Sequence, residues 1–304
     1  MTARPVILLF GGTGQIGHEL ARELRSIGSV IAPTRHDLDL DQPEGARDVI
    51  RRVRPAIVAN AAAYTAVDDA ESNLDACMRL NAQLPDVLAR ECRRVGAVLV
   101  HFSTDYVFDG TKRHPYVETD EPCPLGVYGA SKLAGERAVA SAGGAFLIAR
   151  TSWVYAARGR NFPLTMLRLA RQRMELRVVN DQVGAPTSAP AIAAGVSQVL
   201  NALWSSGDPR GAAEDAAGLY HMTASGSTTW FEFAKVVLAD DPAIGGQTVR
   251  DVVPIATAEY PTPAKRPAFS VLNSTKLAER FGVRLAPWRE QWSGVAGELR
   301  RASR

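Results

Sequence analysis

The chain has 304 residues, 46% of them hydrophobic, and a formal net charge of +3, which suits one α/β domain with a large core plus a smaller lobe. No apolar run approaches the roughly 18 residues of a membrane-spanning helix, and the N-terminus lacks the charged and apolar regions of a secretion signal. The only concentrated basic segment is the tail at 300–304, so we expect a cytoplasmic protein that binds neither membrane nor nucleic acid.

Strand and helix patterns alternate through the first half of the chain. Apolar runs predict strands at 6–10, 29–33, 56–60, 97–102 and 145–150, and helical periodicity predicts helices near 15–27, 43–53, 72–94 and 126–142. The alternation predicts an α/β fold with a Rossmann-type, doubly wound parallel sheet. After residue 150 prolines interrupt the pattern. We expect 151–304 to form mainly a smaller C-terminal substrate-binding lobe, with some segments returning to the sheet, and 205–218 to be a flexible surface connection.

The first predicted strand runs directly into a glycine-rich turn and a helix. Gly11, Gly14 and Gly17 form the pattern G-x-x-G-x-x-G. This spacing permits a tight turn, a close approach of the backbone to a pyrophosphate and close helix–strand packing. We therefore predict that these glycines, with Gln15 and Ile16 between them, bind a dinucleotide and that 1–150 is an NAD(P)-binding domain.

The loop after the second predicted strand bears on the choice of cofactor. An acidic residue there binds the ribose 2′-hydroxyl, whereas an arginine accommodates a 2′-phosphate. Arg35 lies in this loop, and no acidic residue precedes Asp37. We therefore expect NADPH to be preferred, with NADH as the alternative.

Two groups of polar residues are candidates for the chemistry. Tyr128 and Lys132 are four residues apart in a predicted helix and therefore share one face. An ammonium group favours the phenolate of a neighbouring tyrosine, which brings a pKa of about 10 closer to neutrality. Thr104, with Ser103 as second choice, ends the fourth strand, where a hydroxyl can hold a substrate carbonyl oxygen.

The glycine spacing and the Tyr-x-x-x-Lys pair together resemble the short-chain dehydrogenase/reductase superfamily. This resemblance implies that Asp39 and Leu40 contact the adenine end of the cofactor. The small residues that end the third strand would let ribose and nicotinamide lie close to the backbone. We assign this segment, Ala61, Ala62, Ala63 and Tyr64, to the cofactor site.

Longer stretches resemble one family, the dTDP-4-dehydrorhamnose reductases, over nearly the whole chain. The matching segments are 8–17, 60–68 with 70–71, 103–110, 128–136, 150–155, 179–187, 218–221 and 261–267. The most specific are Arg-Thr-Ser-Trp-Val-Tyr at 150–155 and Asn-Asp-Gln-x-Gly-x-Pro-Thr at 180–187. The resemblance implies NAD(P)H-dependent reduction of the C4 ketone of dTDP-4-dehydro-L-rhamnose to dTDP-L-rhamnose.

The resemblance also assigns roles to individual positions. It implies that Thr104, Tyr128 and Lys132 are catalytic and that the last two also contact the cofactor. Contacts to the dTDP-sugar are implied for Thr104, Asp105, Tyr128 and Trp153. Arg266 is implied to bind the diphosphate, for which guanidinium geometry is well suited, with Lys265 as the competing cation.

Two other functions remain open. One is a related sugar-nucleotide epimerase or dehydratase; the Thr-Asp-Tyr sequence at 104–106, where dehydratases have Thr-Asp-Glu, weighs against it. The other is a non-catalytic regulatory subunit like that of methionine adenosyltransferase, against which the complete Tyr–Lys pair and glycine motif argue.

The chain departs from the family in one respect. Some members dimerise around a magnesium ion held by carboxylates late in the chain, but the corresponding segments 189–191 and 288–292 contain few carboxylates. The three cysteines and five histidines are scattered. We therefore predict no bound metal, with monomer and homodimer both open.

Overall fold

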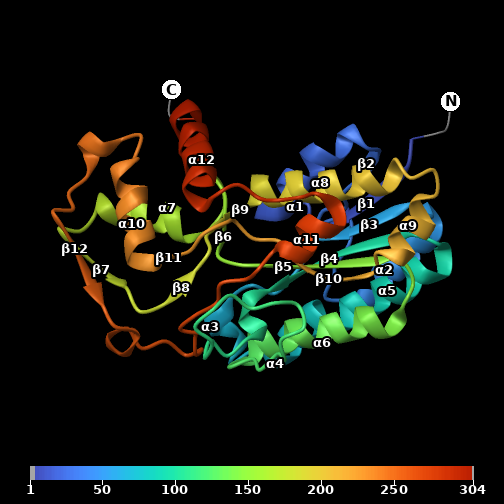
Figure 1. Cartoon of the computed structure of the whole chain (residues 1–304), viewed down its shortest axis with the longest axis horizontal. Helices are drawn as coiled ribbons and strands as arrows, with labels where there is room; N and C mark the ends of the chain where they lie inside the picture. The colour runs from blue at the N-terminus through green and yellow to red at the C-terminus, as the bar shows by residue number, and fades with distance from the viewer. Residues whose placement is uncertain (1–3, 303–304) are drawn as a thin grey trace.

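A six-stranded parallel sheet organises the larger part of the computed structural model, which describes residues 4–302 (Figure 1). Its order is β10-β5-β4-β3-β1-β2, and every adjacent pair is parallel. The strands are β1 (Val6–Phe10), β2 (Ser29–Ile31), β3 (Ile57–Asn60), β4 (Val98–Thr104), β5 (Phe146–Thr151) and β10 (Gly218–His221). Strand order reverses between β1 and β3, which confirms the predicted doubly wound α/β fold and marks where such sheets bind ligands.

Helices cover both faces of this sheet (Figure 1). On one face α1 (Gln15–Glu23) and α8 (Ala189–Trp204) bury apolar side chains against the strands, together with α11 (Thr275–Phe281). The opposite face is covered by α2 (Pro43–Val53), α5 (Leu84–Val95) and α6 (Val127–Ala142). Because both faces are covered, the strands read as continuous apolar runs in the sequence.

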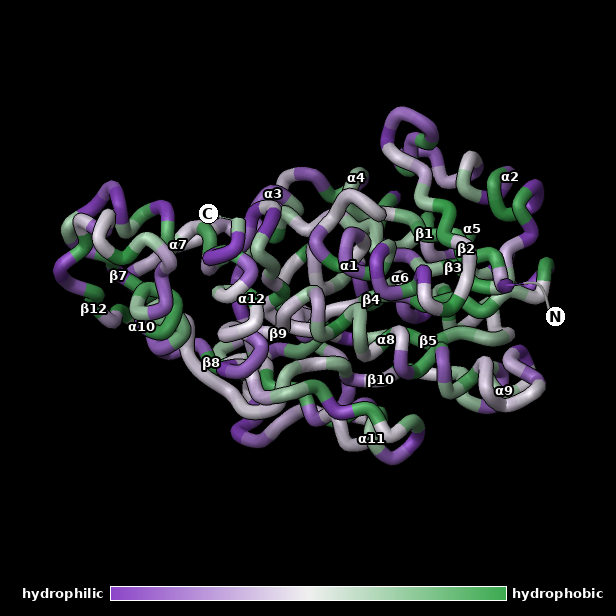
Figure 2. Tube along the Cα trace, turned by 90° about the horizontal axis from the view of Figure 1, so that it is seen from above, coloured by the Kyte–Doolittle hydropathy of each residue, from purple (hydrophilic) through white to green (hydrophobic). Residues whose placement is uncertain are grey.

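A second hydrophobic cluster lies at the other end of the molecule (Figures 1 and 2). It is formed by α7 (Phe162–Ala170), β7 (Glu175–Val179), α10 (Trp230–Ala239), β12 (Asp251–Ile255) and α12 (Trp288–Ala302). Strand β7 pairs in parallel with β12, and Trp292, Phe233 and Tyr155 fill the centre of the cluster. Residues after 150 therefore contribute both to this cluster and, through β10, to the main sheet.

Short elements complete the chain. They are η1 (Leu24–Ser26), α3 (Val67–Ala70), α4 (Leu74–Met78), η3 (Asp105–Val107), β6 (Val154–Tyr155), β8 (Val183–Gly184), β9 (Thr187–Ser188), α9 (Pro209–Asp215), β11 (Thr228–Thr229), η4 (Ile244–Gly246) and η5 (Thr257–Glu259). Within residues 4–302 no helix is long and apolar enough to cross a membrane.

The helix expected near 72–94 is confirmed over 74–95, but it contains an unpredicted π-helical turn over Arg79–Gln83, where the buried Asn81 side chain bonds to the backbone of Tyr64. One prediction about local structure was wrong. The segment 205–218, expected to be a flexible connection, contains helix α9. Asp208 caps this helix by accepting a hydrogen bond from the Gly211 amide, and Pro209 occupies its first turn, a combination that favours helix initiation.

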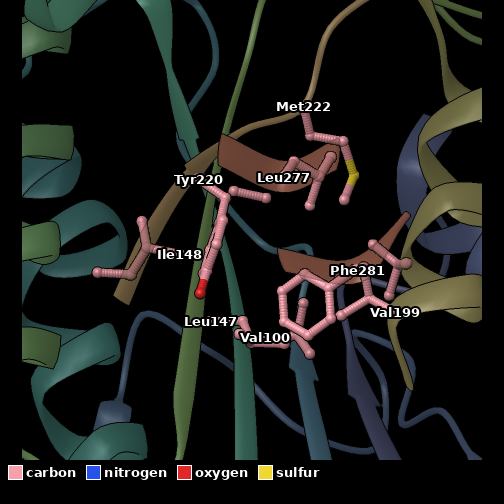
Figure 3. Close-up of a pocket in the computed structure, with 10 residues that line it drawn as sticks. Val100, Leu147, Ile148, Val199, Tyr220, Met222, Leu277 and Phe281 are labelled. Atoms are coloured by element: carbon pink, nitrogen blue, oxygen red, sulfur yellow. The ribbon is translucent and has the colours of Figure 1, made fainter. Parts of the chain in front are cut away.

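A small apolar cavity of about 20 Å³ lies between the sheet, α8 and α11 (Figure 3). Its walls include Val100, Leu147, Val199, Leu277 and Phe281. A cavity of this size with an apolar lining gives a water molecule no hydrogen-bond partners, so it should stay dry. Its lining side chains already lack some packing contacts.

Shortening Leu277, which is 1% exposed, should enlarge this cavity. We expect Leu277→Ala to lower the free energy of unfolding by about 3–5 kcal/mol, the upper part of the range for leucine truncations. Urea unfolding followed by circular dichroism measures this change. Leu74, 53% exposed, provides the control, and equal losses in the Leu74→Ala and Leu277→Ala proteins would contradict the packing argument.

Candidate active site

Two adjoining cavities open at the carboxyl edge of the sheet, where its strand order reverses. The smaller, about 270 Å³, lies beside the glycine turn and the loop after β2, and the larger, about 720 Å³, extends past the ends of β3, β4 and β5. Gly14 and residues 61–63 line both cavities, so the two form one continuous groove. A groove of this shape can hold an extended ligand along the ends of the strands.

The glycine turn has no room for side chains at two of its positions. Gly11 has φ +76°, and a Cβ atom there would lie 2.5 Å from the Ala62 amide nitrogen. A Cβ at Gly17 would lie 2.0 Å from the Gly11 carbonyl oxygen. These contacts bring the first turn of α1 against the end of β1 and leave the helix N-terminus open toward the groove.

Most residues predicted to bind the cofactor line this groove. Those in the smaller cavity or shared by both are Gly11, Gly14, Arg35, Asp39, Leu40, Ala61, Ala62 and Ala63, and those in the larger cavity are Gln15, Ile16, Tyr128 and Lys132. Gly17 and Tyr64 are not among the lining residues. Gly17 packs the helix onto the turn, and Tyr64 has its backbone held by Asn81.

Arg35 stands at the rim of the smaller cavity. Its side chain is 84% exposed, and its nearest ionic partner is Asp41, with Nη2 and Oδ2 separated by 3.4 Å. Asp37 instead accepts hydrogen bonds from the Thr34 amide and hydroxyl. The guanidinium is therefore available to an anion at this end of the groove.

Tyr128 lies near the start of α6, in the wall of the larger cavity. Its ring contacts Tyr106 edge-on, with 5.6 Å between the ring centroids. Burial raises the pKa of Tyr128 to about 12, and a hydrogen bond with Thr104 only partly offsets this rise. The predicted shift of this pKa toward neutrality is thus wrong for the protein without ligands, because desolvation of the phenolate dominates. The phenol carries its proton at neutral pH.

Lys132 lies one helical turn further along and is 2% exposed. Burial lowers the pKa of its ammonium to about 8, while the carboxylate of Glu136 acts in the opposite direction. Glu136 is itself held by Arg150 through bonds of 2.7 and 2.6 Å. Within residues 4–302 no hydrogen-bond acceptor is paired with the ammonium, so it can bind a ligand hydroxyl in the groove.

Thr104 and Asp105 follow one another at the end of β4 and are both buried. The Thr104 hydroxyl donates to Asp105 Oδ1 at 3.1 Å. Burial raises the pKa of Asp105 to about 7, although hydrogen bonds from Ser270 and Thr104 act against this rise. The other carboxyl oxygen, Oδ2, has no hydrogen-bond partner within the described part of the chain. The groove therefore contains a carboxyl group that is easily protonated.

Trp153 has a backbone conformation that is rare for a large side chain, with φ +46°. Its indole stacks on Trp230 of α10 with 3.4 Å between centroids. Gly184 makes this stack possible, since a Cβ there would lie 2.4 Å from the Trp153 ring. Strain of this kind is typical of functional sites.

Arg266 does not line the groove but a third cavity of about 360 Å³, which adjoins the groove at Trp230. Trp230 and Phe162 line both this cavity and the larger part of the groove. The Arg266 guanidinium forms an ion pair with Asp68. The sequence predicted a phosphate as the partner of Arg266 and did not predict this carboxylate. Lys265, the competing cation, is exposed.

Sequence reasoning missed several residues that organise the site. Asn81 donates to Ser131 Oγ at 3.0 Å and bonds to the Tyr64 backbone, which links α6 to the loop after β3. The sequence offered one signal for Asn81, which is a polar residue on the buried face of a predicted helix. Trp230 and Asp68 gave no signal of comparable strength.

The described residues show no obvious metal site. Within 4–302 no group of three or more His, Cys, Asp or Glu side chains is arranged so that it could hold a metal ion. The expectation about magnesium concerns a site shared by two subunits and stays a prediction.

A dinucleotide-type glycine turn, a Tyr–Lys pair on one helix face and a strand-end threonine define a short-chain dehydrogenase/reductase-like site. Residues 5–301 match the family described as RmlD substrate binding domain, and the chain belongs to this family. A dTDP-4-dehydrorhamnose reductase of Burkholderia thailandensis is 50% identical over 286 residues, which cover 93% of this chain and 95% of that protein.

Solved structures agree with this assignment. A dTDP-4-dehydrorhamnose reductase from Clostridium acetobutylicum superposes with a TM-score of 0.86 at 35% identity, covering 97% of this chain and 99% of that one. One from Bacillus anthracis, described as a complex with NADP, has the same TM-score at 33% identity and the same coverage.

The raised pKa of Asp105 should lower stability as pH rises. Between pH 3.8 and about 7 the unfolded state loses this proton and the folded state keeps it, so unfolding becomes easier. Asp105→Asn removes the titration. We expect the variant to be more stable than the parent, by a difference in unfolding free energy that grows from about pH 4 to 7 and levels off at an order of 2–4 kcal/mol.

Urea unfolding at pH 4 to 8 tests this expectation. Asp109 is the control, because hydrogen bonds from the Thr111 amide and hydroxyl help to lower its pKa. Asp109→Asn should lose stability relative to the parent above about pH 4, the opposite sign. A gain at Asp105 that is the same at every pH would disprove the buried-acid argument.

Proposed function

We propose that the protein is a dTDP-4-dehydrorhamnose reductase that uses NADPH, with NADH as a weaker alternative, to reduce the C4 ketone of dTDP-4-dehydro-L-rhamnose. The observation that carries the proposal is the convergence of Thr104, Tyr128 and Lys132 on a groove that begins at the glycine turn. Relatives named as dTDP-4-dehydrorhamnose reductases support the substrate.

The residues along the groove fit a nicotinamide dinucleotide. The close packing at Gly11 and Gly17 places the N-terminus of α1, which no side chain within 4–302 caps, beside the groove for a pyrophosphate. The Arg35 side chain, 84% exposed and 3.4 Å from Asp41, can reach a 2′-phosphate. Lys132, which has no hydrogen-bond acceptor within the described residues, fits the ribose hydroxyls. When bound, the nicotinamide supplies the hydride that reduces the carbonyl carbon.

Three side chains complete the reduction. As negative charge develops on the C4 oxygen, Thr104 holds that oxygen by a hydrogen bond and Tyr128 transfers its proton to it. The buried phenol retains its proton at neutral pH, as a donor must. Lys132, on the same helix face, stabilises the phenolate that remains. The product is an alcohol, and the phenolate regains its proton from solvent.

The sugar nucleotide would span the large cavity and the third cavity. Trp153 and Asp105 lie at the catalytic end for contacts to the sugar, and Arg266 lies in the third cavity for the diphosphate. We propose these contacts from position and chemistry. Oligomeric state and a cytoplasmic location remain predictions.

A spectrophotometric assay tests the function directly. NADPH oxidation should require dTDP-4-dehydro-L-rhamnose and yield dTDP-L-rhamnose. Epimerised or dehydrated product without net NADPH consumption would instead identify a related epimerase or dehydratase. Absence of turnover despite tight cofactor binding would favour a regulatory subunit.

Tyr128→Phe removes the proton donor and little else. Because acid catalysis of this kind contributes about 10²–10⁴-fold, we expect kcat to fall by at least about 100-fold with the Kd for NADPH nearly unchanged. Tyr155→Phe is the control, since the Tyr155 hydroxyl is buried without a hydrogen-bond partner in the second cluster. A Tyr128→Phe enzyme that kept a tenth of kcat would rule out this role.

Arg35→Ala should distinguish the two cofactors. Loss of a cation beside the 2′-phosphate should raise the Kd for NADPH by about tenfold, which corresponds to about 1.4 kcal/mol, and leave the Kd for NADH unchanged. Fluorescence titration of each cofactor measures the effect, with Arg47→Ala as an exposed control. Equal changes for both cofactors would show that Arg35 does not recognise the phosphate.

A further inference from the structure

Asp68 makes a two-pronged ion pair with Arg266, although the two residues are 198 positions apart. Asp68 lies on α3, just beyond the end of β3, whereas Arg266 lies in the proline-rich loop that borders the third cavity. The Arg266 Nη1 and Nη2 atoms donate to Asp68 Oδ1 and Oδ2 at 3.1 and 2.8 Å. Asp68 Oδ1 also accepts from the Ala264 amide at 3.2 Å. One carboxylate thus fixes both the guanidinium and the loop that carries it.

The Arg266 guanidinium has five N–H groups, and the pairing with Asp68 leaves some of them without an acceptor. Besides Asp68, Nη1 also has the Thr262 hydroxyl at 2.5 Å and the Ala264 carbonyl oxygen at 3.0 Å as acceptors. Both Nη1 hydrogens and one Nη2 hydrogen are therefore committed. The other Nη2 hydrogen and the Nε hydrogen have no acceptor within residues 4–302. These two lie along the same edge of the planar group.

That remaining edge has the geometry of a phosphate-binding fork. Two parallel N–H groups on one guanidinium edge bind two oxygens of a phosphate at once, a geometry that lysine cannot reproduce. The Arg266 side chain is 21% exposed and borders the third cavity, so a ligand there can reach it. An arginine with no fixed partner would have to be ordered when the ligand binds, at a cost in side-chain entropy.

We propose that Asp68 is a positioning residue for sugar-nucleotide binding: it holds Arg266 so that only the Nε/Nη2 edge is presented to the diphosphate. The inference rests on the proposed function, in which Arg266 meets the diphosphate. Asp68 itself touches neither the cofactor nor the reacting carbonyl. It acts through the orientation of its partner.

The opposite role is also physically reasonable and predicts the opposite result. If Asp68 merely occupied Arg266 until substrate displaced it, its removal would free the guanidinium and tighten binding. The direction of the change in affinity therefore separates a positioning residue from an internal competitor.

The experiment measures dTDP binding by calorimetry and steady-state kinetics for Asp68→Ala, Arg266→Ala and the double variant. We expect Asp68→Ala to raise the Kd for dTDP and the KM for the sugar nucleotide by about 5–10-fold, with kcat and the Kd for NADPH unchanged. Arg266→Ala should show at least a tenfold loss. The double variant should be no worse than Arg266→Ala alone, because Asp68 acts through that side chain.

Asp69→Ala is the matched control, since Asp69 is the neighbouring exposed acid on the same helix. Asp68→Asn, which retains an acceptor oxygen, should recover part of the affinity. Tighter dTDP binding, an unchanged Kd in Asp68→Ala, or additive losses in the double variant would each overturn the proposal. A wild-type protein that binds dTDP but fails to reduce the keto-sugar would refute the reductase activity alone, since calorimetry needs no turnover.

Discussion

Desolvation at the carboxyl edge of the sheet controls the chemistry of this site. Burial raises the pKa of Tyr128 and Asp105 and lowers that of Lys132, so all three groups are shifted toward their uncharged forms. Such shifts are opposed only where hydrogen bonds or opposite charges are supplied. A cofactor and a substrate bring such groups, which means that ligand binding and the protonation of the catalytic residues are linked.

A buried ion pair holds the helix that carries Tyr128 and Lys132 in place. Arg150 on β5 holds both carboxylate oxygens of Glu136 on α6, and both side chains are almost completely buried. Removing one partner of such a pair leaves an uncompensated charge and is strongly destabilising. The pair therefore fixes α6, and with it Tyr128 and Lys132, against the strand that leads to Trp153.

Much of this fold is legible in the sequence because its signals are local. The apolar runs of the parallel strands indicate burial on both faces of the sheet. The glycine spacing indicates a turn that has no room for side chains. The π-helical turn at 79–83 was missed because a distant backbone, that of Tyr64, binds Asn81 and overrides helical periodicity. Asp68 was missed as a partner of Arg266 for the same reason: nothing in either segment reports a contact across 198 positions.

The stacked indoles of Trp153 and Trp230 have a further consequence. Trp153 follows β5 directly after the main sheet ends, and Trp230 is the first residue of α10 in the second cluster, so the stack links the segment that leaves the sheet to that cluster. Trp153 borders the catalytic cavity and Trp230 borders that cavity and the third. Occupancy of either cavity therefore alters the surroundings of a tryptophan pair, which gives the protein an intrinsic optical reporter of ligand arrival.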